Sequence, residues 1–308
     1  MESRQARMTS VAPAQRPAHC PERREMTHSS RAQRQKRTQD VLALLDAAQY
    51  TLGDQTVSLE LDALVSGTRV LQSLPPVRCG PERPWPKVSV MGATSTQAVH
   101  RAPAGARVTV LNFASGTRVG GGFLTGSLAQ EEDLCRTSTL FSSLSCDAAR
   151  PFYEAGRAAG IMGADAAVLS PGVLFFLDEH GQPISPRRAN IISCAAPNLR
   201  EFPGDPARQC EAGERIRVRT RLVLRAAEEL GTDHLILGAW GCGVFANDPA
   251  VVAPAMLFAL GDHLKNDDST FAEVTFAIPE PRAEGPDNLT TFLEAVVAYG
   301  GPARESLG

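Results

Sequence analysis

The sequence lacks the cysteine patterns that mark disulfide-stabilised and zinc-stabilised proteins. The 308 residues include seven cysteines, an odd number, and no two of them form a CxxC pair. They are Cys20, Cys79, Cys135, Cys146, Cys194, Cys210 and Cys242. A disulfide framework and a structural zinc site are therefore disfavoured. Reduced thiols are typical of the cytosol, so we expect a cytoplasmic protein.

The chain also lacks long apolar runs and a strong net charge. No run approaches the roughly 20 apolar residues that span a bilayer. The N-terminal arginines precede no apolar segment, so we expect neither a membrane span nor a secretory signal. The formal net charge of −3 provides no general attraction to nucleic acid or to anionic membranes. With 43% hydrophobic and 21% charged residues, the composition is that of an ordinary globular protein with a substantial core.

Three regions follow along the chain. Residues 1–37 are rich in Arg, Gln, Ser and Pro, which predicts a disordered basic tail. Its basic run Arg31–Arg37 is more typical of a solvated segment than of a nucleic-acid contact. Residues 38–87 predict an N-terminal helical extension, with one helix from Thr38 to before Gly53, a second over Leu59–Leu71, and then a stiff proline-rich connection. Residues 88–300 predict a core that forms one compact domain with this extension.

Short apolar runs alternate with helical segments in the core, a pattern that favours an α/β layered fold with a mixed or parallel sheet. The predicted strands are Val88–Val90, Val108–Phe113, Ala166–Leu169, Leu174–Leu177, Asn190–Ala195, His234–Ala239 and Val274–Ile278. The predicted helices are Glu131–Leu144, Arg215–Leu230 and Pro249–Leu264. Ligands of such folds bind in the crevice at the carboxyl ends of the strands.

Two glycine-rich loops follow predicted core strands. The first extends from Leu111 to Phe123 and contains Gly120-Gly121-Gly122, and the second extends from Leu237 to Asp248 and contains Gly241-Cys242-Gly243. Glycine permits positive φ and close approach of the backbone, so that successive N–H groups can converge on a phosphate oxygen. Two such loops at one sheet edge predict a two-sided binding site for a diphosphate.

Two adjacent glutamates lie near the first loop. Seven residues separate Gly122 from Gln130-Glu131-Glu132, which begin a predicted helix. Acidic residues commonly favour a helix N-terminus for electrostatic reasons alone. Because adjacent helical residues point about 100° apart, one glutamate can hold a substrate while the other faces the reacting bond.

Other motifs are absent. Neither loop contains the GxGxxG arrangement of dinucleotide-binding oxidoreductases. No His, Asp and Cys residues have the spacing of metal ligands, so we expect no metal and no cofactor. Trp240 fits a core position better than a base-stacking one. Cys242 fits a position that requires a small side chain better than a nucleophilic one.

The combination of Gly120-Gly121-Gly122 with Gln130-Glu131-Glu132 resembles the signature of poly(ADP-ribose) glycohydrolases. The segments Asn112-Phe113-Ala114, Ala196-Pro197-Asn198 and Gly238–Phe245 are similar to the bacterial branch of that family. The resemblance extends over roughly residues 38–297. It implies a macrodomain-like three-layer α/β/α sandwich with a mixed sheet and an N-terminal helical extension.

The resemblance also implies roles for individual residues. Glu132 would protonate the oxygen that leaves the anomeric carbon and then activate water, and Glu131 would hydrogen-bond ribose hydroxyls. Asn112 would contact either the ribose or the loop. The substrate-binding residues implied are Asn112, Gly120, Gly121, Gly122, Gln130, Gly241, Cys242, Gly243, Val244 and Phe245.

The expected activity is hydrolysis of the ribose–ribose O-glycosidic bonds of poly(ADP-ribose), mainly from the terminal end, in the DNA damage response. The partners would be poly(ADP-ribose) or ADP-ribosylated proteins, with ADP-ribose as product, no nucleic-acid requirement and no membrane. Two alternatives remain on the same fold, a macrodomain that reads ADP-ribose without cleaving it and a mono-ADP-ribosyl hydrolase. The Gln-Glu-Glu spacing favours the polymer hydrolase over both.

Overall fold

The computed structural model describes residues 29–73, 85–266, 271–280 and 287–299. The predicted disorder of residues 1–28 and most of the predicted proline-rich connection lie outside the described residues. Among the helices of the described ranges, none combines the length and the apolar character needed to cross a bilayer.

A seven-stranded mixed sheet forms the centre of the molecule. In spatial order its strands are β3 (Arg69–Leu71), β6 (Ala167–Leu177), β7 (Pro183–Cys194), β5 (Val108–Phe113), β8 (His234–Leu237), β9 (Glu273–Ala277) and β4 (Lys87–Met91). The pairs from β7 to β4 are parallel, and β6 pairs antiparallel with both β7 and β3. The carboxyl ends of the parallel strands therefore meet at one edge of the sheet.

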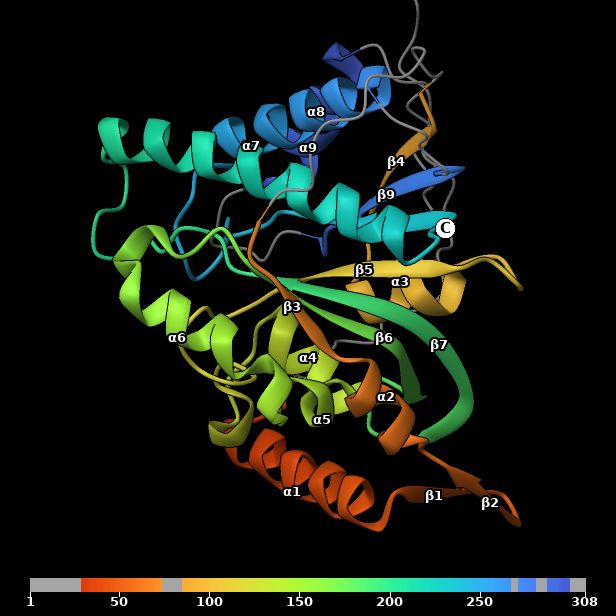
Figure 1. Ribbon diagram of the computed structural model, residues 1–308. Coiled ribbons are helices and arrows are strands. Elements are labelled where there is room, and N and C mark those ends of the chain that lie inside the picture. Colours follow the sequence, from red (N-terminus) through yellow and green to blue (C-terminus); the bar gives the residue numbers. More distant parts are fainter. Residues whose placement is uncertain (1–28, 74–84, 267–270, 281–286, 300–308) are drawn as a thin grey trace, which may run out of the picture.

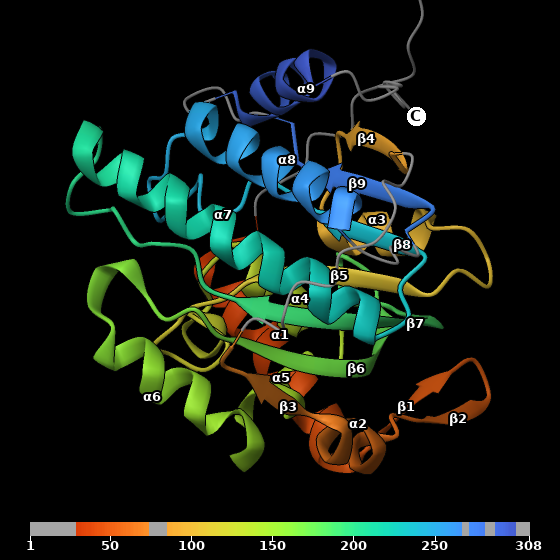
Figure 2. The same ribbon diagram turned by 45° about the horizontal axis from the view of Figure 1, so that its top comes forward.

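Helices cover both faces of the sheet (Figure 1). One face packs against α1 (Arg31–Ala47), α2 (Leu61–Gly67), α3 (Ser95–Arg101), α4 (Gln130–Thr137), α5 (Leu140–Ser145) and α6 (Arg150–Ala158). The other face packs against α7 (Pro206–Glu229), α8 (Pro249–Asn266) and α9 (Asn288–Ala298). The turned view shows the same three layers (Figure 2). The predicted macrodomain-like α/β/α sandwich is confirmed.

The central strands are apolar on both faces because a helical layer covers each. In β5, Val108 and Val110 belong to the core on the α1–α6 side, whereas Leu111 belongs to the core on the α7–α9 side. All three side chains are at most 3% exposed. Continuous apolar runs are typical of parallel strands buried in this way.

Helix α1 begins at Arg31, seven residues before the predicted start at Thr38. The segment Arg31–Arg37 therefore belongs to a helix, which corrects its assignment to a disordered tail. Ser30 caps the helix, because its side chain and that of Gln33 each accept a hydrogen bond from the other's backbone N–H. The first two turns contain no buried residue, so no apolar periodicity marked them in the sequence.

The N-terminal extension was predicted to be helical, and this prediction is wrong in part. A hairpin of β1 (Gln49–Leu52) and β2 (Gln55–Ser58) follows α1. The predicted second helix is shorter than expected, since α2 ends at Gly67 and β3 follows it. Because β3 pairs with β6, the extension contributes an edge strand to the main sheet.

Other boundaries differ for local reasons. The two strands predicted over residues 166–177 are one strand, β6, with a bulge between Ser170 and Val173. The predicted helix Glu131–Leu144 divides into α4 and α5, because Ser138 adopts an extended conformation and bridges to Phe175. Helix α7 begins at Pro206, earlier than predicted, and β7 begins at Pro183. Helices α3, α6 and α9 were not predicted.

Candidate active site

A cleft of about 2200 Å³ lies at the carboxyl ends of the parallel strands. Its wall includes residues that follow β5, β7, β8 and β9, together with the N-terminus of α4. Both glycine-rich loops line it, as the sequence predicted. Among the residues that the structure describes, no three His, Cys, Asp or Glu side chains are grouped closely enough to hold a metal ion.

Glu131 and Glu132 lie in the first turn of α4 and both line the cleft. They are only 3% and 6% exposed. Their hydrogen-bond partners differ, since Glu131 accepts from residues that follow or end β5 and Glu132 accepts from the triple-glycine loop. The helix geometry thus gives the two carboxyl groups different surroundings, as expected from the sequence.

Glu132 is held by one carboxyl oxygen. Its Oε1 accepts a hydrogen bond from the backbone N–H of Gly122 at 2.7 Å. Its Oε2 is buried and has no hydrogen-bond partner among the described residues. An unpaired polar atom in a buried position is costly unless a ligand or water satisfies it. Glu132, which lines the cleft, therefore has one carboxyl oxygen whose hydrogen-bonding capacity is unused.

Glu131 is held by both oxygens. Its Oε2 accepts from the N–H of Ser115 at 2.8 Å, and its Oε1 accepts from the side-chain amide of Asn112 at 3.3 Å. Burial raises the pKa of Glu131 to about 8. The N–H of Ser115 limits this rise because it stabilises the ionised form, whereas the charge of Glu132 adds to the rise. The raised pKa means that Glu131 binds a proton at neutral pH.

This pKa makes the stability of the protein depend on pH. Between the unfolded value near 4.5 and the folded value of about 8, the folded state holds a proton that the unfolded state has lost. We therefore expect the free energy of unfolding to decrease as the pH rises through this window. Glu131→Gln should remove that part of the decrease.

Thermal denaturation of wild type and Glu131→Gln at pH 5, 6, 7 and 8 measures the effect. The melting temperature of the variant should rise relative to that of wild type as the pH increases. A difference in melting temperature that stays constant over this range would contradict the raised pKa.

The triple-glycine loop packs directly against these two carboxylates. Gly120 and Gly121 both adopt positive φ, at 61° and 59°. A Cβ on Gly121 would lie 2.7 Å from Oε1 of Glu132 and 2.8 Å from Oε2 of Glu131, so only glycine fits there. The N–H of Gly121 donates to the carbonyl of Arg118, and that of Gly122 donates to Glu132. These two N–H groups are thus directed to the protein and not into the cleft.

The N–H groups of this loop that remain free belong to other residues than the triple glycine. Gly116 and Thr117 line the cleft, and their N–H groups have no acceptor among the described residues. Gly120 is not part of the cleft wall and packs against the ring of Phe141.

The second loop presents a different arrangement. Gly241 has a φ of 77°, and its carbonyl accepts from both the backbone N–H and the side chain of Asn247. Gly243, Val244 and Phe245 also line the cleft, and none of their N–H groups has an acceptor among the described residues. Three consecutive free N–H groups beside a cleft form a suitable anion site. The binding of a diphosphate by this loop stays a prediction, which these N–H groups support.

Cys242 lies within this loop, but its thiol is buried. The side chain is 3% exposed, and its sulfur contacts the carbonyl of Trp240 at 3.7 Å. Burial raises the pKa of the Cys242 thiol well above its ordinary value. The residue therefore fills a small space, as the sequence indicated, and a nucleophilic role has no support.

Gln130 and Asn112, both predicted to contact the substrate, are engaged with the protein. The side chain of Gln130 accepts from the N–H of Phe113 at 2.8 Å and donates to the carbonyl of Leu111 at 2.8 Å. Asn112 is fully buried behind Glu131 and also donates to Ser193 at 2.9 Å. Its amide nitrogen thus lies on Glu131 and Ser193, whereas its Oδ1 is buried with no partner among the described residues. Both residues attach α4 or its carboxylate to the end of the sheet.

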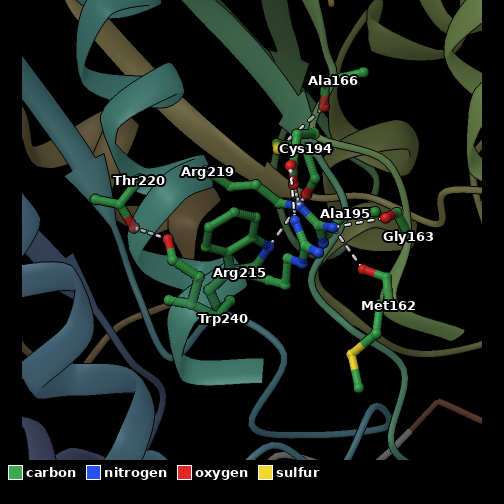
Figure 3. A network of polar contacts seen from close by, with 11 residues as sticks. Met162, Gly163, Ala166, Cys194, Ala195, Arg215, Arg219, Thr220 and Trp240 are labelled. Carbon is green, nitrogen blue, oxygen red and sulfur yellow. Dashed lines mark hydrogen bonds and ion pairs between the residues drawn. The ribbon is translucent and has the colours of Figure 1, made fainter. Parts of the chain in front are cut away.

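A buried arginine that no sequence motif indicated supports the cleft wall (Figure 3). Arg219 of α7 is fully buried and donates to the carbonyls of Ala195 at 2.8 Å and Gly163 at 2.8 Å, and it pairs with Asp165 at 2.9 Å. Trp240 is also fully buried, and its ring N–H donates to the carbonyl of Cys194 at 3.1 Å. The predicted core position of Trp240 is confirmed. A charged residue on the apolar stripe of α7 was the signal that could have revealed Arg219.

Comparison with known proteins places these features in a family. The family model of the microbial-type PARG (poly(ADP-ribose) glycohydrolase) catalytic domain matches residues 38–178, which include the first glycine loop and both glutamates. No curated protein matches the chain.

Solved structures match over most of the chain. The poly(ADP-ribose) glycohydrolase of Thermomonospora curvata is 33% identical, with a TM-score of 0.73, and the match covers 85% of this chain and 98% of that one. A structure of the same enzyme bound to the inhibitor ADP-HPD has a TM-score of 0.72 at the same identity and coverage. The Deinococcus radiodurans enzyme in complex with ADP-ribose is 32% identical, with a TM-score of 0.68, and the match covers 81% of this chain and 99% of that one. The chain therefore belongs to the family of microbial-type poly(ADP-ribose) glycohydrolases.

Proposed function

We propose that the protein hydrolyses the ribose–ribose O-glycosidic bonds of poly(ADP-ribose), mainly from the terminal end, and releases ADP-ribose. The observation that carries this proposal is the state of Glu132. One of its oxygens is fixed by Gly122, the other is buried without a hydrogen-bond partner, and the residue lines the cleft. A pure ADP-ribose reader needs no acid at the anomeric carbon.

The proposed reaction uses one carboxyl group twice. Glu132 gives its proton to the oxygen that leaves the anomeric carbon, so that the glycosidic C–O bond breaks and a cationic sugar forms. The same group, now ionised, takes a proton from water as the water oxygen bonds to the anomeric carbon. The diphosphate of the bound unit stabilises the positive charge. Glycosidases commonly use two opposed carboxylates, but here a single actor with a helper fits the residues present.

Glu131 acts as the helper. Because it binds a proton at neutral pH, it can donate a hydrogen bond to a ribose hydroxyl. The free N–H groups of Gly243, Val244 and Phe245 bind the diphosphate, and the ring of Phe245 packs beside it. The two carboxyl groups are positioned by Gln130, Asn112 and the triple glycine, which do not themselves contact the substrate in this proposal.

The compartment and context are also proposed. The described cysteines Cys135, Cys146, Cys194, Cys210 and Cys242 are all free thiols, which supports a reducing, cytoplasmic compartment. The substrate would be polymer on ADP-ribosylated proteins formed in the DNA damage response.

Incubation with an automodified polymerase tests the reaction. We expect free ADP-ribose to accumulate while the polymer shortens gradually, and we expect no change in excess EDTA, since the proposed chemistry uses only carboxyl groups, backbone N–H groups and water. Gel electrophoresis of the polymer and chromatography of the product measure both.

Other outcomes would assign other functions. Binding of ADP-ribose without its release indicates a reader, and release only from singly modified protein indicates a mono-ADP-ribosyl hydrolase. Early long fragments would contradict action from the terminal end, and complete loss of activity in EDTA would contradict the metal-independent reaction.

A further inference from the structure

Two arginines of α1 border the cleft. Arg31 and Arg34 both line it, although they lie about 100 residues before Glu132 in the sequence. The Nε of Arg31 donates to the carbonyl of Thr125 at 2.9 Å, and the Nε of Arg34 donates to the carbonyl of Gly126 at 2.8 Å. Nη1 of Arg34 also donates to the carbonyl of Ser29. Both side chains are thus fixed, and the terminal nitrogens of Arg31 and Nη2 of Arg34 have further N–H groups to offer.

These contacts connect α1 to the loop that holds Glu132. Gly122 donates to Glu132, and the next residue, Phe123, accepts a hydrogen bond from the hydroxyl of Thr38 at 3.0 Å. The short turn Phe123–Thr125 then leads to the two carbonyls that hold the arginines. The arginines therefore lie at the edge of the cleft beside Glu132, on a different segment from the free N–H groups of Gly243–Phe245.

The charges of these two arginines are not compensated. Lys36, on the same helix, pairs with Asp40 at 3.0 Å. Arg31 and Arg34 have no carboxylate partner within 4.0 Å in the described part of the chain. Like charges three residues apart on a helix repel each other. An anion bound between them would remove that repulsion.

We propose that Arg31 and Arg34 form a subsite for the diphosphate of the next polymer unit, the one that remains on the leaving side of the scissile bond. This inference rests on the proposed function. One ADP-ribose unit occupies the site at the second loop with its anomeric carbon at Glu132, so the rest of the polymer must leave past Glu132. Each further unit carries a diphosphate, and the guanidinium fork matches the geometry of phosphate oxygens. The subsite thus favours polymer over a single ADP-ribose group.

Binding measurements test the subsite without requiring turnover. In a Glu132→Gln background, fluorescence anisotropy would compare labelled poly(ADP-ribose) of defined length with labelled ADP-ribose. Adding Arg31→Gln and Arg34→Gln should weaken polymer binding about tenfold at low salt, as for two partly screened charge contacts. The slope of log affinity against log salt should fall by about 0.7 per lost phosphate contact, as for single-stranded nucleic acids. The affinity for ADP-ribose should change less than about twofold.

Two further variants distinguish charge from loop geometry. Arg31→Lys with Arg34→Lys keeps both charges but loses the guanidinium forks, so its polymer affinity should lie between those of the wild-type arginines and the Gln variant. Arg101→Gln with Arg188→Gln removes two exposed arginines outside the cleft and should leave both affinities unchanged. Equal losses for polymer and ADP-ribose, equal losses in the Gln and Lys variants, or an unchanged polymer affinity would each overturn the subsite.

The proposed function is tested independently of the subsite. If wild type releases no ADP-ribose from polymer, the glycohydrolase proposal is rejected, while the anisotropy comparison still decides whether the two arginines bind polymer.

Discussion

Glu132→Gln is expected to lower the rate of polymer hydrolysis about 10²–10⁴-fold, the usual contribution of general acid–base catalysis. The amide keeps the size of the side chain, and its oxygen can still accept from the N–H of Gly122. It has no proton to give to a leaving oxygen and no charge with which to activate water. Affinity for ADP-ribose should therefore remain close to that of wild type.

Release of ADP-ribose from polymer under single-turnover conditions, together with calorimetry of ADP-ribose binding, measures both quantities. Glu154→Gln provides a matched control, because Glu154 is an exposed glutamate of α6 outside the cleft wall. A Glu132→Gln rate within about threefold of wild type would remove Glu132 from the catalytic role.

Valine at Gly243 is expected to lower ligand affinity, whereas valine at Gly121 is expected to lower stability. A Cβ on Gly243 meets nothing within 4 Å, so Gly243→Val should fold normally. Its side chain would occupy the cleft at the free N–H groups and lower ADP-ribose affinity by about tenfold or more, equivalent to at least about 1.4 kcal/mol. Gly121 has positive φ and contacts both carboxyl groups. Gly121→Val should therefore destabilise the fold by about 1–3 kcal/mol from backbone strain alone, with further loss from the contacts.

Denaturant unfolding separates the two effects before any binding is measured. Gly243→Ala provides the smaller step, and the loss of affinity should increase from alanine to valine at constant stability. Unchanged affinity in Gly243→Val would show that the second loop is not the diphosphate site. Wild-type stability in Gly121→Val would contradict the seating of the carboxylates on that loop.

The sequence predicted best where burial left a clear pattern. Strand β5 was predicted with its observed ends, Val108 and Phe113, because helices bury both of its faces and every position tends to be apolar. The first turns of α1 were missed because their residues are partly or fully exposed. The edge strand β3 was missed because three residues that are stabilised by pairing with β6 have no periodic pattern of their own.

The sequence predicted which loops form the site, but not how their peptide groups are oriented. Both loops are rich in glycine, and the sequence assigned the same role to both. The orientation of each loop peptide depends on partners outside the loop pattern, such as Glu132, which accepts from the N–H of Gly122, and Asn247, which donates to the carbonyl of Gly241. The same reason explains Gln130, whose amide could have reached a substrate but is bound to the backbone of β5. Arg219 depends on carbonyls more than 20 residues away in the chain.

The hydrogen bond from Gly122 to Glu132 is made by the main chain, which affects how this part of the sequence can diverge. Every amino acid except proline supplies the same N–H, so the chemistry alone does not require glycine at position 122. The requirement comes from Ser127, whose side chain a Cβ on Gly122 would overlap. Positions 122 and 127 should therefore change together over evolution, with a larger residue at 122 accepted only in lineages that first acquire glycine at 127.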